Sequence, residues 1–350
     1  MTEKLPIDLF AEFARYGRQQ NVSLRDPQSV TSFVSDAKKA LTRAIGSDIL
    51  LHGQRTERMF EALIISLGHY KLLKLEDTGL VHPEGSYIAP DFRVALSDGS
   101  QWLVEVKNVY DRDPSRQQFW ATDEYLSRLK SYATTVGCPL KLALYWARWG
   151  IWTLFDASDL TQVDGQWTID MFQAMRVNEF SLLGDLTIGT KPPLRFRLLV
   201  DPAKPRSVGL DGVVSFTIER AALYSGDTEI VDPTEQSIAW ILMNLGEWEC
   251  SEPRAFISND MLDAIELEWN PRERANPNEA FEMIGTLSSM FSRDYAMHTL
   301  DEGGVVQAEA ELRPGWFSSL VTSDQSKSLP LWRFILQPNR QIQAVTRQSG

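Results

Sequence analysis

Cysteine and histidine are scarce in this chain, which has two cysteines and four histidines among 350 residues. Two cysteines are too few for a disulfide framework or a cysteine-based zinc site. The histidines also lack the spacing of metal ligands; they are His52, His69, His82 and His298. The sequence therefore argues against a zinc enzyme and against a nuclease that depends on histidine.

Long apolar runs and nucleotide-binding motifs are missing as well. No run approaches the ~20 apolar residues of a membrane helix, and the stretch from Met1 to Pro6 lacks the apolar core of a signal peptide. The pattern Gly-x-x-x-x-Gly-Lys-Ser/Thr of ATP-driven motors does not occur. We expect a cytoplasmic protein without a membrane partner, and its hydrophobic content of 43% is that of a soluble globular chain.

Positive charge is in deficit, because 35 Lys and Arg face 47 Asp and Glu, which gives a net charge of −12. The deficit is uneven: residues 1–178 carry 20 basic and 22 acidic side chains, whereas residues 179–350 carry 15 and 25. Attraction to nucleic-acid phosphates is therefore expected in the first half only.

The length favours more than one domain. Helical spacing of apolar residues over 5–16 and 30–45 predicts an N-terminal helical extension, residues 1–50, that acts as a cap or faces a partner. The remaining chain divides by composition and pattern into a region over 51–178, which carries the candidate site, and an acidic α+β region over 179–350.

The most informative stretch is a β-hairpin predicted over residues 89–107. Its turn, residues 97–100, contains Asp-Gly, a strong hairpin signal. Because side chains alternate along a strand, Glu105 and Lys107 share one face, about 6–7 Å apart at ~3.3 Å per residue. Asp91, at the head of the partner strand, can lie beside them. Two carboxylates and an ammonium at a strand end can hold a divalent cation and assist a water nucleophile.

These residues, Pro90-Asp91 and Glu105-Val106-Lys107, resemble the signature of the PD-(D/E)XK nuclease superfamily. That superfamily includes restriction endonucleases, archaeal Holliday-junction resolvases and RecB-like nucleases. The resemblance implies that Asp91 and Glu105 are metal ligands, with the Val106 carbonyl as a third, and that all three charged side chains are catalytic. The implied cofactor is Mg²⁺, for which Mn²⁺ can substitute. The alternative is an ordinary charge pair on a solvated strand face.

A helix predicted over residues 55–67 precedes the hairpin and ends at Gly68. Glu57 lies on the flank of its apolar stripe, and Glu61 lies further round. The spacing Gly53, Glu57, Gly68 is similar to the first helix of resolvase-like members of the superfamily, in which a helix glutamate joins the metal site. The resemblance implies Glu57 as a further catalytic and metal-binding residue, with Glu61 in reserve. A solvated helix glutamate is the alternative.

The predicted order of elements over roughly 50–158 is helix, strand, hairpin, helix, strand, strand. Apolar patterns place the strands over 69–76, 141–147 and 151–155 and the second helix over 117–136. A mixed sheet flanked by helices is the expected α/β arrangement, and the order resembles the αβββαβ arrangement of the superfamily. The fold class is therefore α/β and restriction-endonuclease-like.

The predicted second helix offers polar side chains for contact with the scissile phosphate. The candidates are Gln117, Gln118, Arg128 and Lys130. The Gln-x-x-x-Tyr pattern that related families carry on this helix is missing, so none of them is assigned. Lys107, in an apolar sheet beside a metal, is expected to have a lowered pKa.

The acidic second half contains three predicted helices followed by a predicted hairpin, over 234–245, 260–267, 278–291 and 295–312. This order suggests a winged-helix-like module at about 233–313. Its third helix, which we expect to be capped by Asn278, carries Glu279 and Glu282 and has no basic residue before Arg293, although phosphate contact requires Lys or Arg. We therefore expect this half to bind a protein partner or a second copy of the chain.

These features predict a metal-dependent DNA endonuclease that hydrolyses phosphodiester bonds with a Mg-activated water. The superfamily associates such enzymes with phage defence, restriction or mobile-element processing. Two alternatives stay open. One is an RNase, since nothing in the sequence separates DNA from RNA. The other is a non-catalytic nuclease-fold subunit that binds DNA or assembles a larger complex.

Overall fold

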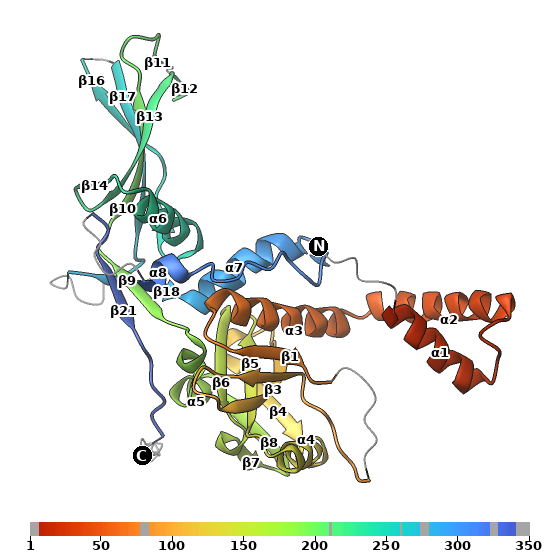
Figure 1. The fold of residues 1–350 in the computed structure, drawn as a ribbon. Coiled ribbons are helices and arrows are strands. Elements are labelled where there is room, and N and C mark those ends of the chain that lie inside the picture. Colours follow the sequence, from red (N-terminus) through yellow and green to blue (C-terminus); the bar gives the residue numbers. More distant parts are fainter. Residues whose placement is uncertain are drawn as a thin grey trace. The chain divides into compact units, whose positions relative to one another are not determined.

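A computed structural model describes residues 7–77, 84–209, 212–259, 261–273, 280–322 and 328–340 (Figure 1). The chain divides into two compact units, residues 1–55 and 56–350. Within the described residues, no helix is both long and apolar enough to cross a membrane.

The first unit is a helical hairpin. It contains α1 (Ile7–Gln20), α2 (Pro27–Ile45) and the start of α3 (Asp48–Leu67), so the predicted N-terminal helices are confirmed. The Asp26 side chain accepts a hydrogen bond from Gln28 N and caps α2. The Phe33 ring lies 5.4 Å from the rings of both Phe13 and Tyr16, which joins the two helices.

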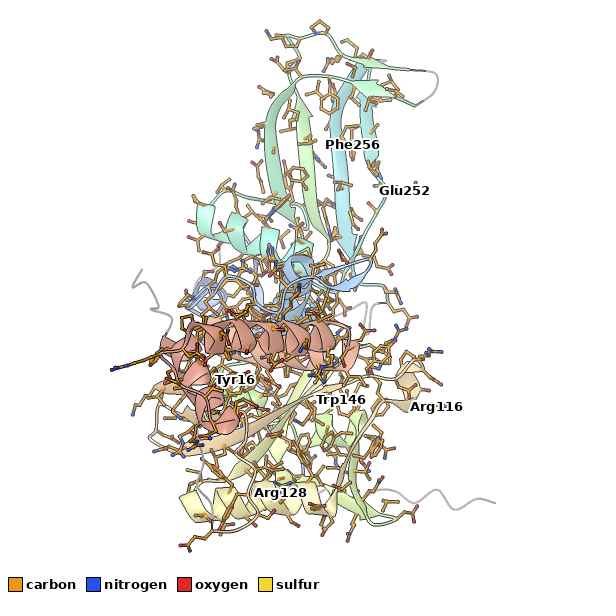
Figure 2. The ribbon with its side chains drawn as sticks, turned by 90° about the vertical axis from the view of Figure 1, so that its right-hand side faces the viewer. Tyr16, Arg116, Arg128, Trp146, Glu252 and Phe256 are labelled. Atoms are coloured by element: carbon orange, nitrogen blue, oxygen red, sulfur yellow. The ribbon has the colours of Figure 1, made fainter. Side chains whose placement is uncertain are left out.

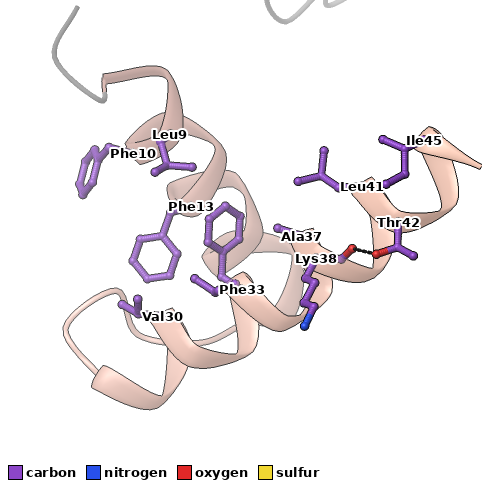
Figure 3. Close-up of a pocket in the computed structure, with 11 residues that line it drawn as sticks. Leu9, Phe10, Phe13, Val30, Phe33, Ala37, Lys38, Leu41, Thr42 and Ile45 are labelled. Atoms are coloured by element: carbon purple, nitrogen blue, oxygen red, sulfur yellow. Dashed lines mark hydrogen bonds between the residues drawn. The ribbon is translucent and has the colours of Figure 1, made fainter. Parts of the chain in front are cut away.

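An apolar groove of about 550 Å³ runs along this hairpin. Figure 3 shows Phe13 and Phe33 between the helices and Leu41 and Ile45 further along α2. Most of the apolar side chains that line the groove are exposed to solvent. They are Leu9, Phe10, Val30, Val34, Leu41 and Ile45. The hairpin therefore buries little apolar surface of its own.

The central sheet of the second unit has the strand order β1-β2-β3-β5-β6. Its strands are β1 (Leu72–Leu75), β2 (Phe92–Ala95), β3 (Gln101–Val109), β5 (Leu140–Trp146) and β6 (Ile151–Asp156). Only β3 and β5 among these neighbours run parallel. The mixed α/β sheet and its hairpin agree with the predicted class.

Two helices cover the two faces of this sheet (Figure 1). The part of α3 after Thr56 packs Phe60, Leu63 and Ile64 against Val104 and Val106 in one hydrophobic core. On the other face, α4 (Asp123–Val136) packs Leu126 and Leu129 against Leu103, Leu142 and Leu144. Alternation along β3 thus places Glu105 and Lys107 on the α4 face.

The predicted helix over 117–136 is half wrong. Its first part is a strand, β4 (Gln118–Thr122), which follows a 3-10 turn, η1 (Pro114–Arg116). Phe119 and Ala121 are buried while their neighbours are exposed, a period of two that a strand requires. The strand is stabilised by β8 (Gln166–Asp170), which also pairs with β7 (Thr161–Val163). Thr122 then caps α4 by accepting from Tyr125 N.

Residues on both sides of 178 share one hydrophobic core. A three-stranded sheet, β18-β9-β21, is built from β9 (Thr187–Thr190), β18 (Glu282–Thr286) and β21 (Leu331–Phe334). The helix α7 (Leu287–Thr299) packs on β6, where Trp152 Nε1 donates to Ser292 Oγ at 3.0 Å. Shorter elements complete this region: η2 (Ala157–Asp159), α5 (Met171–Arg176), η3 (Phe180–Leu183) and α8 (Ser318–Thr322).

A long antiparallel β arm forms the rest of the second unit (Figure 1). Its sheet contains β10 (Leu194–Val200), β13 (Ile218–Ser225), β14 (Thr228–Ile230), β15 (Glu249–Cys250), β16 (Arg254–Ser258) and β17 (Met261–Asn270). A small ribbon of β11 (Ser207–Val208) and β12 (Val214–Ser215) adjoins it. One helix, α6 (Pro233–Leu245), contacts it through the rings of Phe196 and Trp240, 5.5 Å apart. Figure 2 shows Phe256 on the arm.

The winged-helix-like module is not confirmed. Residues 261–270 form strand β17 rather than a helix, because buried and partly exposed side chains alternate from Leu262 to Glu266 while the backbone pairs with β10. The third predicted helix is β18 followed by α7, and the predicted hairpin shrinks to β19 (Leu300–Asp301) and β20 (Gly304–Val305). The predicted start at Asp260 and the predicted cap Asn278 lie outside the described residues.

Candidate functional site

Strand pairing brings Asp91 and Glu105 together in the central sheet, where β2 begins beside the middle of β3. At the start of β2, Phe92 pairs with Val104 of β3, so the residue before Phe92, Asp91, lies beside the residue after Val104, Glu105. The Asp91 carboxylate accepts a hydrogen bond from Val106 N at 2.7 Å. Both carboxylates are buried, with 9% of Asp91 and 3% of Glu105 exposed. Buried carboxylates require partners.

Lys107 is one of those partners. Its Nζ lies 2.5 Å from Glu105 Oε1. The second partner is the Tyr125 hydroxyl from the first turn of α4, which donates to the same oxygen. The Lys107 ammonium also lies 5.6 Å from the centre of the Tyr125 ring.

Tyr125 is a site residue that the sequence pattern did not identify. It is part of the apolar stripe of α4, and its spacing predicts a core residue. Its place in the first turn of α4 could have identified it, because a long side chain with a polar tip can reach the neighbouring strand from there. Its hydroxyl donates to Glu105, which an apolar core residue could not do.

The charges of this cluster perturb one another. Burial and the nearby Glu105 charge raise the pKa of Asp91 to about 8. Burial alone would lower the pKa of Lys107, but the charges of Glu105 and Asp91 outweigh it and raise that pKa instead. The expected lowering of the Lys107 pKa requires the charge of a bound cation and stays a prediction. Burial and Glu105 also raise the pKa of the Tyr125 hydroxyl, which stays a donor.

Glu57 reaches the cluster from α3, the helix on the opposite face of the sheet. Burial raises its pKa, the Lys107 charge opposes that shift, and the Glu105 charge adds to it. Glu57 is thus within electrostatic range of both β3 side chains. The reserve candidate Glu61 instead forms an ion pair with Arg58 at 3.0 Å.

The candidates for phosphate contact have other partners or lie elsewhere. Gln117 is buried and its Oε1 accepts from Arg148 N at 3.0 Å. Arg128 donates to the Tyr87 carbonyl at 3.5 Å. The Lys130 ammonium lies 4.7 Å from the Trp167 ring centre. Gln118 is exposed on β4. The structure does not bring these four into the Asp91–Glu105–Lys107 cluster.

The donor set fits a hard divalent cation. Mg²⁺ prefers oxygen ligands, keeps several waters and needs only one or two carboxylates, and Asp91 and Glu105 are adjacent and buried. Their mutual repulsion, visible in the raised pKa of Asp91, is what a cation would relieve. Across the described residues, no three or more His, Cys, Asp and Glu side chains are already grouped closely enough to hold a metal. A cation here would therefore draw on two carboxylates and water, with Glu57 within electrostatic range of both carboxylates.

Comparison with known proteins gives a structural likeness but no match in sequence. No protein-family model and no curated protein sequence matches the chain. Among solved structures, the chain is similar to a Holliday junction resolvase from the archaeal hyperthermophile Archaeoglobus fulgidus, at 17% identity and a TM-score of 0.29. That match covers 38% of this chain and 96% of the resolvase chain.

Proposed function

We propose that this chain is a metal-dependent nuclease of the PD-(D/E)XK type that hydrolyses phosphodiester bonds in nucleic acid. The observation that carries the proposal is that Asp91, Glu105 and Lys107 lie together in the central sheet. Asp91 and Glu105 are buried, whereas an ordinary charge pair on a solvated strand face would be exposed. Perturbed titratable groups gathered at one place are typical of catalytic sites.

Asp91 and Glu105 are the residues that would hold Mg²⁺ or Mn²⁺, with the Val106 carbonyl and Glu57 as further ligands. When bound, the ion supplies charge neutralisation and a water of lowered pKa. We assign Lys107 stabilisation of charge on the phosphate, because its ammonium pairs with Glu105 beside the carboxylates that would hold the ion. Tyr125 fixes the orientation of the Glu105 carboxylate through its hydroxyl.

DNA is the proposed substrate, in phage defence, restriction or mobile-element processing. The acidic residues 179–350 would then serve a protein partner or self-association, because phosphate contact requires basic side chains. An RNase and a non-catalytic subunit are the competing functions, and the same assay separates them.

The test is cleavage of supercoiled plasmid, linear duplex, single-stranded DNA and RNA with Mg²⁺, Mn²⁺ or EDTA. We expect cation-dependent cutting of DNA that falls at least ~100-fold in Lys107→Ala, the usual scale for a catalytic side chain. The matched control is Lys74→Ala, a lysine of the same sheet that pairs with Glu76 away from the cluster. Cutting of RNA alone would favour the RNase. No cutting of any substrate, with no cation bound at Asp91 and Glu105, would rule out the nuclease.

A further inference from the structure

Exposed aromatic and arginine side chains gather near the edge of the sheet at which β3 and β5 end. Tyr110, Trp120 and Trp149 are 61%, 62% and 49% exposed, although large aromatic side chains are usually buried. We call the following residues the aromatic platform: Tyr110, Arg112, Arg116, Trp120, Arg148 and Trp149. Figure 2 shows Arg116 on the outside of this region and Trp146 among the buried side chains.

The fold holds the segments of the platform together. Because β3 and β5 are parallel and Val109 pairs with Trp146, the residues after both strands leave the sheet at the same edge. Two hydrogen bonds then join the segments: Arg148 N donates to Gln117 Oε1 at 3.0 Å, and Trp149 Nε1 donates to the Pro114 carbonyl at 3.2 Å. Trp149 is therefore oriented by its own N–H while half of its surface remains exposed.

Trp120 faces solvent because side chains alternate along β4 between the core and the solvent. Phe119 and Ala121 point into the core beneath α4, so the side chain between them points outward. It lies three residues beyond Gln117 along an extended segment, a distance of ~10 Å. Trp120 and Trp149 are thus exposed on two segments that these hydrogen bonds hold together.

This surface is close to the catalytic cluster. Tyr110 follows Lys107 by three residues at the end of β3, which corresponds to ~10 Å. Stacked nucleotides follow each other at ~3.4 Å along one strand, so the backbone at Tyr110 lies roughly three nucleotides' length from the backbone at Lys107.

The chemistry of the platform matches unpaired bases. Aromatic side chains stack on the faces of bases, which a single strand exposes and an intact duplex does not, and arginine adds cation–π and phosphate contacts. Acidic neighbours limit the electrostatic part: Arg116 pairs with Asp113 at 3.3 Å, and Asp111 lies next to Arg112. In a chain of net charge −12, stacking is the contribution that remains available.

We propose that the aromatic platform binds the unpaired bases of a single-stranded segment beside the scissile phosphodiester. This inference rests on the proposed nuclease function and narrows its substrate to single-stranded nucleic acid or a duplex with a single-stranded flank.

The test measures binding apart from cutting. In the Lys107→Ala background with EDTA, the affinity for a fluorescent oligo(dT) strand and for a blunt duplex is determined by anisotropy. We expect the strand to bind more tightly than the duplex. Trp120→Ala and Trp149→Ala should each weaken strand binding about 5- to 150-fold, the range for loss of one stacked base, and Trp→Phe at either position should restore part of it.

Trp240→Ala is the matched control, because Trp240 is also 49% exposed but lies on α6 against Phe196; it should leave strand binding unchanged. Equal binding of strand and duplex, or platform variants that bind like the parent, would overturn the inference and indicate a protein-facing surface. Cutting by the wild type is assayed separately. A wild type that cuts while its platform variants bind normally refutes the platform alone, and platform-dependent binding without cutting refutes the nuclease alone.

Discussion

At the residue scale, Glu105 is the group around which the site is arranged. One of its oxygens accepts from both Lys107 and Tyr125, while its strand neighbour Val106 fixes Asp91 through a backbone N–H. The two contacts to Glu105 are charge-assisted, and such hydrogen bonds are the stronger ones in proteins. The cluster is thus oriented before any substrate or cation arrives.

Tyr125→Phe tests this orientation. Loss of the hydroxyl removes a hydrogen bond to a charged group, worth ~1.5–3 kcal/mol, so we expect kcat to fall about 10- to 100-fold with little change in KM. The control is Tyr132→Phe on the same helix, where the hydroxyl donates to the buried Glu76 at 2.8 Å. If both variants lose activity equally, Tyr125 acts only through the stability of α4.

Asp185 gives a pH dependence away from the site. It is buried, with 8% of its surface exposed, and burial raises its pKa to about 6 despite hydrogen bonds from Ser288. A pKa raised in the folded state means that its contribution to stability is complete below the unfolded pKa of 3.8 and is lost as pH rises through about 6.

The test compares the free energy of unfolding of the wild type with that of Asp185→Asn. The free energy of unfolding of the wild type relative to Asp185→Asn should fall by up to ~3 kcal/mol between pH 4 and pH 7, at 1.36 kcal/mol per pKa unit. Urea unfolding at several pH values measures it. A difference that does not vary with pH would show that Asp185 is ionised throughout.

At the scale of elements, the hairpin of α1 and α2 depends on few contacts. Phe33 provides the ring pairs with Phe13 and Tyr16, and most other apolar side chains along the groove stay exposed. Short helices gain most of their stability from packing, so these ring contacts carry a large share of it.

Phe33→Ala should therefore unfold this hairpin locally. Losing two aromatic contacts at ~0.5–1.5 kcal/mol each predicts amide hydrogen exchange at least several-fold faster in α1 and α2. Val34→Ala, the adjacent exposed position on α2, is the control and should leave exchange near the wild-type rate. Equal acceleration by both variants would contradict the role of the ring cluster.

At this scale, the sequence predicts elements that depend on residues close together in the chain and fails for elements whose partners are far apart in the chain. The hairpin with Asp91 and Glu105 depends on alternation along its strands and on the turn over residues 97–100, and α3 depends on its own apolar stripe. Both elements could therefore be predicted from a short stretch of sequence. Strand β4 could not, because its partner β8 lies about fifty residues later. The same holds for β17, whose pairing with β10 overrides a short helical pattern. Tyr125 was missed because its hydrogen-bond partner lies on another element.

At the scale of the whole molecule, charge limits how nucleic acid can bind. Residues 1–55 carry 8 basic and 6 acidic side chains, which leaves 27 basic and 41 acidic ones in residues 56–350. Broad attraction to phosphates is therefore absent from the unit that holds the site, and the few arginines of the platform must act locally.

The salt dependence of strand binding measures this limit. Single strands lose affinity with a slope of about −0.7 per neutralised phosphate, so three arginines predict a slope of log K against log salt no steeper than about −2. Arg148→Ala should make it shallower by about 0.7. A slope near −5 would mean that a basic surface outside the platform binds the strand.

The bond between Trp152 and Ser292 has a consequence for the timing of synthesis. These residues are 140 positions apart, and ribosomes add ~5–20 residues per second, so roughly 7 to 28 seconds separate the translation of β6 from that of α7. During that interval the α3 face of the sheet lacks the helix that packs against β6. The nascent chain therefore exposes an apolar surface until α7 has emerged.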